Sequence, residues 1–314
     1  MSTMNAVRIH TYGGPEVLSY EEAPRPHPGP GEVVVKVHAT SVNPFDAAVR
    51  AGYLAGYFNY SLPLIPGTDV AGVVEEVGEG VDEWSPGDVV YGRAGVIRDG
   101  AYAEYVALPS TDVARKPESL DFLHAAAVPH VILTAWQALI VAGGLAEGQT
   151  VLVHGAGGGV GHVAVQLAKS RGAHVIGTGS TNIDFVRELD VDQAIDYSTT
   201  PFEDVAGEVD IVLDIVGGDT LERSWTILKP GGILVSTVEP PSEETALSKG
   251  VRQHFVTTAP PIGEVLTEVA AMVDAGKIVP EVTKVVPLPE IQQGHESIES
   301  RHTRGKIAVQ VVPD

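Results

Sequence analysis

The chain contains no cysteine, which excludes a disulfide framework, a thiol nucleophile, an iron–sulfur cluster and any zinc site built on thiolates. Basic residues are scarce: 20 lysines and arginines stand against 41 aspartates and glutamates, for a formal net charge of -21. Such a surface repels phosphodiester backbones, so we expect no nucleic-acid partner. No apolar run approaches the roughly 18 residues of a membrane span. The first residues also lack a signal-peptide pattern, so we expect a cytoplasmic, unprocessed protein without membrane contacts.

A length of 314 residues suggests two domains, and an apolar content of 44% is enough for a full core. The first 120 or so residues are punctuated by glycine and proline. Short β-branched runs lie between these turns, at 32–38, 70–77 and 88–91. This pattern predicts a small antiparallel barrel or sandwich.

Strands and helices alternate after residue 121, which is typical of an α/β fold with a doubly wound parallel sheet. A mostly apolar stretch at 124–142 has helical spacing. The tail, with an amphipathic helix at 262–275, is expected to return to the first domain. We therefore predict one domain from residues 1–125 and 258–314 and a dinucleotide-binding domain from 126–257. The six expected strands of the latter are 150–154, 173–176, 193–196, 209–214, 232–237 and 254–257.

A glycine-rich loop, VLVHGAGGGVG at 151–161, follows the first of these strands and opens a helix. Glycines allow a tight turn and a close approach to a pyrophosphate, and the helix start offers free N–H groups. A plain tight turn is the alternative, but the strand–loop–helix–strand context favours a dinucleotide. We predict that Gly158, Gly159 and Val160 hold the pyrophosphate.

The second strand lacks the acidic residue that usually binds the ribose 2′-hydroxyl of NAD. Ser180 and Thr181 stand there instead, which favours NADPH, although no arginine or lysine is adjacent and use of both cofactors stays open. Ligands of such sheets bind beyond the carboxyl ends of the strands. Further cofactor contacts are therefore expected from Tyr197, Val216, Val238 and Phe255, with Tyr197 as an ordinary surface residue the alternative.

Several motifs together resemble the medium-chain dehydrogenase/reductase superfamily over the whole chain, most closely its zinc-independent, NADPH-dependent quinone oxidoreductases. The resemblance implies a GroES-like first domain, a Rossmann second domain and NADPH bound between them. It also implies a homodimer, with 232–237 pairing across a two-fold axis. The motifs are Gly13–Leu18, Ser41–Asp46, Arg50–Tyr53, Pro66–Gly72, Leu133–Leu139, Leu228–Gly232 and Arg304–Ile307.

The zinc ligands of the alcohol dehydrogenases are not matched. Their positions correspond here to Asn43, Thr68 and His130, and a catalytic zinc needs three protein ligands. We therefore expect a metal-free enzyme. Without a Lewis acid an unactivated ketone is a poor substrate. A quinone or an α,β-unsaturated carbonyl needs no such activation.

Four residues are candidates near the reacting groups. The resemblance implies that Asn43 hydrogen-bonds the nicotinamide ribose or a substrate oxygen and that Thr134 contacts the nicotinamide, although an Asx turn also explains Asn43 before Pro44. Tyr53 is the candidate for a hydrogen bond to the substrate, with packing and loop closure as the alternative role. His130 is either a proton donor or a neutral buried histidine.

The remaining expectations concern the reaction. Asp46 is expected to pair with Arg50, one helical turn on. We predict hydride transfer from NADPH to a quinone. The alternatives are an alkenal or enone reductase on the same scaffold and a protein that binds NADPH without turnover.

Overall fold

The computed structural model describes residues 2–95, 97–257, 261–300 and 303–312. The chain forms two compact units. The first comprises Met1–His130, Pro261–Ala275 and Pro280–Asp314, and the second comprises Val131–Pro260 and Gly276–Val279. The sequence had suggested boundaries at 125 and 257. Among the described residues, no helix is long and apolar enough to cross a membrane.

The first unit is built on a seven-stranded sheet with the order β14-β15-β3-β4-β5-β7, in which β6 also pairs with β3. The β-branched runs explain these strands, because Val33, Val35 and Val37 of β3 are fully buried in the core. A separate two-stranded sheet joins β1 to β2. The strands are β1 (Thr3–Ile9), β2 (Leu18–Pro24), β3 (Glu32–Val42), β4 (Asp69–Val77), β5 (Val89–Arg93), β6 (Tyr105–Pro109), β7 (Val113–Arg115), β14 (Val282–Pro287) and β15 (Lys306–Gln310).

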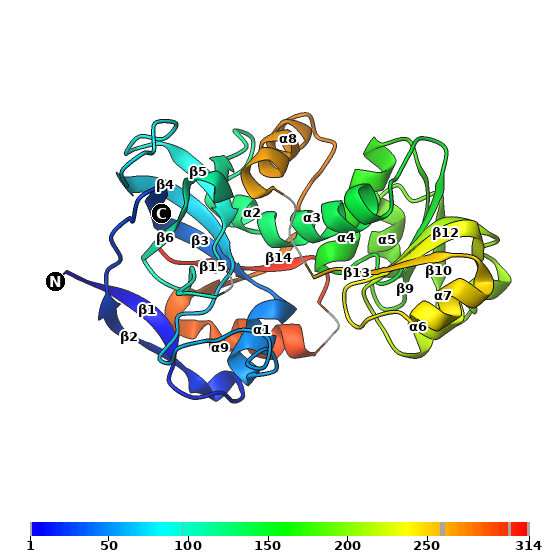
Figure 1. Cartoon of the computed structure of the whole chain (residues 1–314), viewed down its shortest axis with the longest axis horizontal. Helices are drawn as coiled ribbons and strands as arrows, with labels where there is room; N and C mark the ends of the chain where they lie inside the picture. The colour runs from blue at the N-terminus through cyan, green and yellow to red at the C-terminus, as the bar shows by residue number, and fades with distance from the viewer. Residues whose placement is uncertain (1, 96, 258–260, 301–302, 313–314) are drawn as a thin grey trace. The chain divides into compact units, whose positions relative to one another are not determined.

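The tail of the chain returns to this unit, as the sequence predicted: β15 pairs antiparallel with β3, and β14 pairs parallel with β15. Figure 1 shows this return in orange and red beside the blue strands. The helices of the unit are α1 (Pro44–Ala51), α2 (Phe122–Ala126), α8 (Ile262–Asp274) and α9 (Gln292–Glu299), with short 3-10 turns η1 (Pro15–Val17), η2 (Ser110–Asp112) and η5 (Leu288–Glu290).

The second unit is a six-stranded parallel sheet in the order β10-β9-β8-β11-β12-β13, the doubly wound order of a dinucleotide-binding fold. All six predicted strands are present. They are β8 (Thr150–Val153), β9 (His174–Gly179), β10 (Gln193–Asp196), β11 (Val209–Asp214), β12 (Leu228–Ser236) and β13 (Arg252–Phe255). The helical segments are α3 (Pro129–Trp136), whose first two residues count to the first unit, η3 (Gln137–Ala142), α4 (Gly159–Ser170), α5 (Ile183–Glu188), η4 (Phe202–Asp204), α6 (Asp219–Ser224) and α7 (Glu243–Lys249).

Two details differ from the sequence predictions. The apolar stretch 124–142 is not one helix but α2, α3 and the π-helical η3, because Pro129 begins a new helix and disfavours helical backbone at the residue before it. The expected two-fold pairing at 232–237 is wrong in position. Strand β12 is hydrogen-bonded on both sides, by β11 and β13, and so offers no free edge.

Candidate active site

The glycine loop between β8 and α4 has a geometry that only glycine satisfies. Gly155 has a φ of +64°, in the left-handed region. A Cβ added to Gly161 would lie 2.2 Å from the carbonyl oxygen of Gly155, so the helix could not pack this closely with any larger residue. The loop therefore brings bare backbone to the end of β8, as close contact with a pyrophosphate requires.

The N-terminus of α4 leaves this backbone available. Gly158 is the residue before the helix, its backbone is extended (φ -84°, ψ -177°), and no side chain caps the helix start. The first N–H groups of a helix have no partner within it, so those of Gly159 and Val160 carry partial positive charge without an acceptor from a capping side chain. The residues present therefore fit a dinucleotide phosphate.

Six other predicted cofactor residues lie along the same edge of this sheet. Each one ends a strand or stands within two residues of its carboxyl end, where ligands of doubly wound sheets bind. Two of them touch each other: the Ser180 hydroxyl donates to the hydroxyl oxygen of Tyr197 over 2.8 Å. Val216 and Val238 are about half exposed, at 48% and 51%. The strand ends and residues are β9 with Ser180 and Thr181, β10 with Tyr197, β11 with Val216, β12 with Val238 and β13 with Phe255.

Sequence reasoning missed Asp214, the last residue of β11. Its carboxylate is fully buried and accepts hydrogen bonds from the backbone N–H groups of Val216 (3.1 Å) and Gly217 (3.0 Å). The hydroxyl of Ser236, at the end of the neighbouring strand β12, donates to it over 3.1 Å. Asp214 therefore holds the loop after β11 in place. An acidic residue closing an apolar strand just before a Gly-Gly pair was the available signal.

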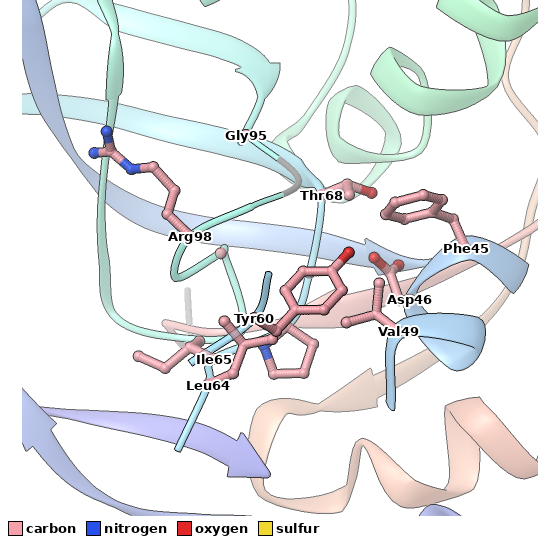
Figure 2. Close-up of a pocket in the computed structure, with 12 residues that line it drawn as sticks. Phe45, Asp46, Val49, Tyr60, Leu64, Ile65, Thr68, Gly95 and Arg98 are labelled. Carbon is pink, nitrogen blue, oxygen red and sulfur yellow. The ribbon is translucent and has the colours of Figure 1, made fainter. Parts of the chain in front are cut away.

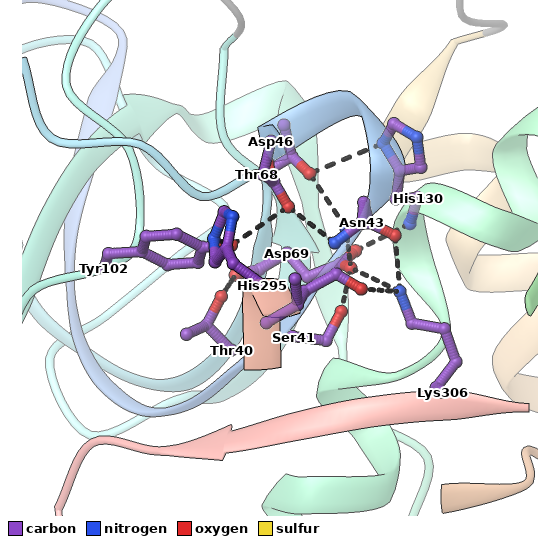
Figure 3. A network of polar contacts seen from close by, with 11 residues as sticks. Thr40, Ser41, Asn43, Asp46, Thr68, Asp69, Tyr102, His130, His295 and Lys306 are labelled. Atoms are coloured by element: carbon purple, nitrogen blue, oxygen red, sulfur yellow. Dashed lines mark hydrogen bonds and ion pairs between the residues drawn. The ribbon is translucent and has the colours of Figure 1, made fainter. Parts of the chain in front are cut away.

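A buried polar cluster lies in the first unit, around the start of α1 and of β4 (Figure 3). Asn43 is at its centre and has no exposed surface. Its amide nitrogen donates to Asp69 (2.8 Å) and Thr68 (3.2 Å), and its amide oxygen accepts from the Lys306 ammonium. The side-chain amide is thus engaged within the protein, and direct contact with nicotinamide or substrate stays a prediction.

Lys306 and Asp69 form a buried ion pair at 3.4 Å, with side-chain exposures of 3% and 0%. Burial alone would raise the pKa of Asp69, but the Lys306 charge and hydrogen bonds from Asn43 and Ser41 bring it below its usual value. Burial lowers the pKa of Lys306, and Asp69 opposes that shift. The sequence analysis did not predict this ion pair. Its Lys306 ammonium holds the side-chain amide oxygen of Asn43 in place.

Asp46 does not pair with Arg50, contrary to prediction. Its carboxylate accepts from the backbone N–H of Asn43 (2.9 Å) and the Tyr102 hydroxyl (3.2 Å). Arg50 turns instead to Glu299 and His295 of α9. Arg50 lies at the end of α1. The returning tail brings α9 beside it and so supplies hydrogen-bond partners that the sequence around Arg50 does not show.

Burial and the charge of Asp69 raise the pKa of Asp46 from 3.8 to about 6. A raised carboxyl pKa means that the folded state binds the proton more tightly. The stabilisation from this proton is full below about pH 4 and is lost as the pH rises through about 6. Asp46→Asn removes the titration, so between pH 4 and pH 7 we expect the variant to gain on the order of 2–3 kcal/mol of unfolding free energy relative to the natural protein.

Urea unfolding at several pH values measures this difference. Asp190→Asn, on an exposed turn, is the matched control and should follow the natural protein throughout. Parallel stability curves for Asp46→Asn and the natural protein would contradict the raised pKa.

His130 is the second residue of α3 and lies beside this cluster. Its backbone N–H donates to Asp69 over 2.7 Å, and its Nδ1 lies 3.4 Å from the Thr68 hydroxyl. The structure thus brings together Asn43, Thr68 and His130, the three positions that match the zinc ligands of the alcohol dehydrogenases. Of the three side chains only the imidazole is a good zinc ligand. Among the described residues, no group of three or more His, Cys, Asp or Glu is placed to hold a metal ion.

Burial, with the nearby Arg93 charge, lowers the pKa of His130 to about 3. The imidazole is therefore neutral at pH 7. Of the two roles considered for His130, the neutral buried histidine agrees with this pKa, and the role of proton donor stays a prediction.

The remaining two candidates lie in more exposed surroundings. The side chain of Tyr53 is 79% exposed, and that of the nearby Tyr57 is 83% exposed. Thr134 is half-buried in α3. The hydrogen bond from Tyr53 to a substrate and the contact of Thr134 with nicotinamide stay predictions.

Comparison with known proteins gives a consistent assignment. Residues 29–118 match the alcohol dehydrogenase GroES-like domain, and residues 189–309 match the family described as zinc-binding dehydrogenase. The mitochondrial NAD(P)H oxidoreductase RTN4IP1 of Danio rerio is 35% identical, over 100% of this chain and 92% of its own length. The chloroplastic NADPH-dependent alkenal/one oxidoreductase of Arabidopsis thaliana is 34% identical, over 99% of this chain and 80% of its own. The solved quinone oxidoreductase of Coxiella burnetii superposes with a TM-score of 0.92 at 35% identity, covering 99% of this chain and 100% of that one.

The two units and these matches define a nicotinamide-dependent oxidoreductase that acts on a small molecule. The chain belongs to the medium-chain dehydrogenase/reductase superfamily, in its quinone oxidoreductase branch.

Proposed function

We propose that the protein is a metal-free reductase that uses NADPH to reduce a quinone. The observation that carries this proposal is the donor set at the zinc-equivalent positions. An amide, a hydroxyl and a neutral imidazole stand there, and the amide of Asn43 is held by Lys306 and Asp69. Without a Lewis acid the acceptor must itself be electron-poor, as a quinone is.

The preference for NADPH is supported by the residues after β9. No carboxylate stands directly after Gly179, and the first acidic residue beyond it, Asp184, is paired with Arg187. The position that usually binds the 2′-hydroxyl of NAD therefore carries no negative charge. The hydroxyls of Ser180 and Tyr197, 2.8 Å apart at this end of the sheet, would donate hydrogen bonds to such a phosphate. The pyrophosphate would lie on Gly158, Gly159 and Val160 at the start of α4.

The chain's part in the reaction is to bind and orient the reactants. When bound, NADPH supplies the hydride. The glycine loop and the Asp214-held loop after β11 fix backbone groups at the sheet edge, so the rate arises mainly from proximity and orientation. We assign the proton that completes the product to solvent, because a neutral imidazole such as that of His130 is a much weaker acid than an imidazolium.

An alkenal or enone is the second candidate acceptor, since the Arabidopsis relative is an alkenal/one oxidoreductase on the same scaffold. The experiment follows NADPH consumption by absorbance with p-benzoquinone, phenanthrenequinone and a short alkenal, with NADH as the control. We expect rapid turnover of both quinones with NADPH. Turnover of the alkenal alone would favour the second candidate, and binding of NADPH without turnover would favour a non-catalytic role.

A further inference from the structure

A buried histidine stands between strand β8 and the glycine loop. His154 has an exposed fraction of 1%, and each of its ring nitrogens lies beside a buried hydroxyl. Its Nδ1 is 3.2 Å from the hydroxyl oxygen of Thr178, in the neighbouring strand β9. Its Nε2 is 2.9 Å from the hydroxyl oxygen of Ser224, the last residue of α6. The imidazole thus connects the sheet to a helix of the same unit.

This imidazole is uncharged at pH 7. Burial, with the Arg223 charge nearby, lowers the pKa of His154 to about 3, although Glu203 acts in the opposite direction. A neutral imidazole carries one ring proton, so one of its nitrogens donates a hydrogen bond and the other accepts one. The hydroxyls on its two sides show which nitrogen is the donor.

The ring proton is on Nε2. The Ser224 hydroxyl donates its one hydrogen to the backbone carbonyl of Thr220 over 2.6 Å, because a carbonyl oxygen can only accept. The Ser224 oxygen is therefore the acceptor for His154, and Nε2 is the donor. Nδ1 is then the acceptor, so the Thr178 hydroxyl donates its hydrogen to His154.

The same direction continues into the glycine loop. Because the hydrogen of the Thr178 hydroxyl is directed at His154, its oxygen accepts from the backbone N–H of Gly155 over 3.3 Å. The carbonyl oxygen of Gly155 in turn accepts from the N–H of Gly158 over 2.9 Å. All these hydrogen bonds donate in one direction, and we call them the His154 chain. The chain joins Gly158, Gly155, Thr178, His154, Ser224 and Thr220.

The His154 chain holds a turn that glycine alone would leave mobile. Gly155 has a φ of +64°, and a glycine backbone populates more conformations than that of any other residue. Hydrogen bonds on both sides of Gly155 restrict it, and bonds aligned in a chain strengthen one another. The turn ends at Gly158, so its geometry sets where the N–H groups of Gly159 and Val160 point.

We propose that His154 is a positioning residue for the dinucleotide, because it directs the Thr178 hydroxyl, and through it the Gly155 peptide, into the geometry that receives the pyrophosphate. The imidazole is buried and engaged at both nitrogens, so it acts through the chain and not by contact with the cofactor. The inference rests on that part of the proposed function which places the pyrophosphate at the start of α4. It does not depend on which acceptor is reduced.

Thr178→Val tests the proposal, because valine keeps the shape of threonine and removes the hydroxyl. His154 and Gly155 then both lose their partner in the chain. We expect NADPH affinity, from fluorescence titration, to fall about 10-fold, since the loop is no longer preorganised. Thr178→Ser keeps the hydroxyl and should bind NADPH within about two-fold of the natural protein.

Val209→Ala separates positioning from loss of stability. Val209 is fully buried in the core at the first residue of β11, at the opposite end of the parallel sheet from the glycine loop. The substitution leaves a cavity and lowers the melting temperature without touching the chain. NADPH affinity, measured below the melting temperature of every variant, should stay within about two-fold of that of the natural protein.

Nitrogen NMR of the cofactor-free protein, labelled at histidine, tests the proton assignment itself, since protonated and unprotonated ring nitrogens give separate signals. We expect a neutral His154 with its proton on Nε2. The signal of its Nδ1 is identified by its shift in Thr178→Val, because that nitrogen loses its hydrogen-bond donor. A proton on Nδ1, or a charged ring at pH 7, would contradict the direction of the chain and overturn the inference.

The affinities decide the positioning role. If Thr178→Val binds NADPH within about two-fold of the natural protein, or if Val209→Ala weakens binding as much as Thr178→Val does, the chain contributes only to stability and the inference fails. Because the readout is binding, a natural protein that binds NADPH but reduces no quinone rejects the proposed acceptor, and the inference is still decided by the affinities. A natural protein that binds neither NADPH nor NADH would reject both.

Discussion

Replacing Gly158 with aspartate is expected to weaken NADPH binding at least about 100-fold without harming the fold. The backbone at Gly158 is extended, which suits any residue, and an added Cβ would meet only the Gly155 carbonyl oxygen, at 3.3 Å. Aspartate is a favoured residue at this position of a helix, so stability should stay the same or rise by a few tenths of a kcal/mol. Its charge, however, would stand where the pyrophosphate binds, and like charges a few ångströms apart repel by several kcal/mol.

Gly158→Asn is the matched control, because asparagine has the same size and also caps helices well. Fluorescence titration with NADPH separates the two effects: the asparagine variant reports bulk alone, and the further loss in the aspartate variant reports charge. Equal NADPH affinity in the natural protein and Gly158→Asp would place the pyrophosphate elsewhere.

Lys306→Met is expected to lower the free energy of unfolding by about 3–5 kcal/mol. The substitution leaves the Asp69 carboxylate fully buried without its cation, and it frees the amide oxygen of Asn43. Methionine fills most of the volume of the lysine side chain. The loss of unfolding free energy therefore measures the effect of the missing charge and not that of a cavity. Urea unfolding at pH 7 measures it.

Two further variants test the reason for this loss. Lys249→Met, on the exposed end of α7, should change stability by less than about 0.5 kcal/mol. Adding Asp69→Asn to Lys306→Met should recover a large part of the stability, since the buried Asp69 charge that lost its cation is then removed. A loss below about 1 kcal/mol for Lys306→Met would mean that Asp69 takes up a proton in the fold and the pair contributes little.

The second unit was predictable because its signals are local. Alternating strands and helices, and a glycine loop between the first strand and its helix, are read from neighbouring residues. The six strands and their doubly wound order followed directly. The interior position of β12 did not, because strand order depends on which strands pair across long connections and not on any one segment.

The cluster around Asn43 was predictable only in part. Asn43 itself was found from its motif, but its partners Asp69 and Lys306 stand 237 residues apart and meet only because β15 returns to β3. The same return gives Arg50 its partners on α9 and takes it away from Asp46. Local spacing cannot show either contact.

The choice among tyrosines shows the same limit. Tyr53, Tyr57 and Tyr60 lie within eight residues and have equal chemistry in the sequence. Burial distinguishes them, since of these three only Tyr60 (Figure 2) has a hydroxyl that is buried and lacks a partner among the described residues. This difference in burial cannot be predicted from the sequence alone, and the hydrogen bond from Tyr53 to a substrate stays a prediction.

The most direct test of the central claim is the rate of NADPH oxidation with p-benzoquinone before and after exhaustive dialysis against a chelator. We predict rapid turnover that the chelator leaves unchanged and that added Zn²⁺ does not raise, because an amide, a hydroxyl and one imidazole occupy the zinc-equivalent positions. A rate that disappears on chelation and returns with Zn²⁺ would contradict the account. Absence of quinone turnover in the untreated protein would contradict it as well.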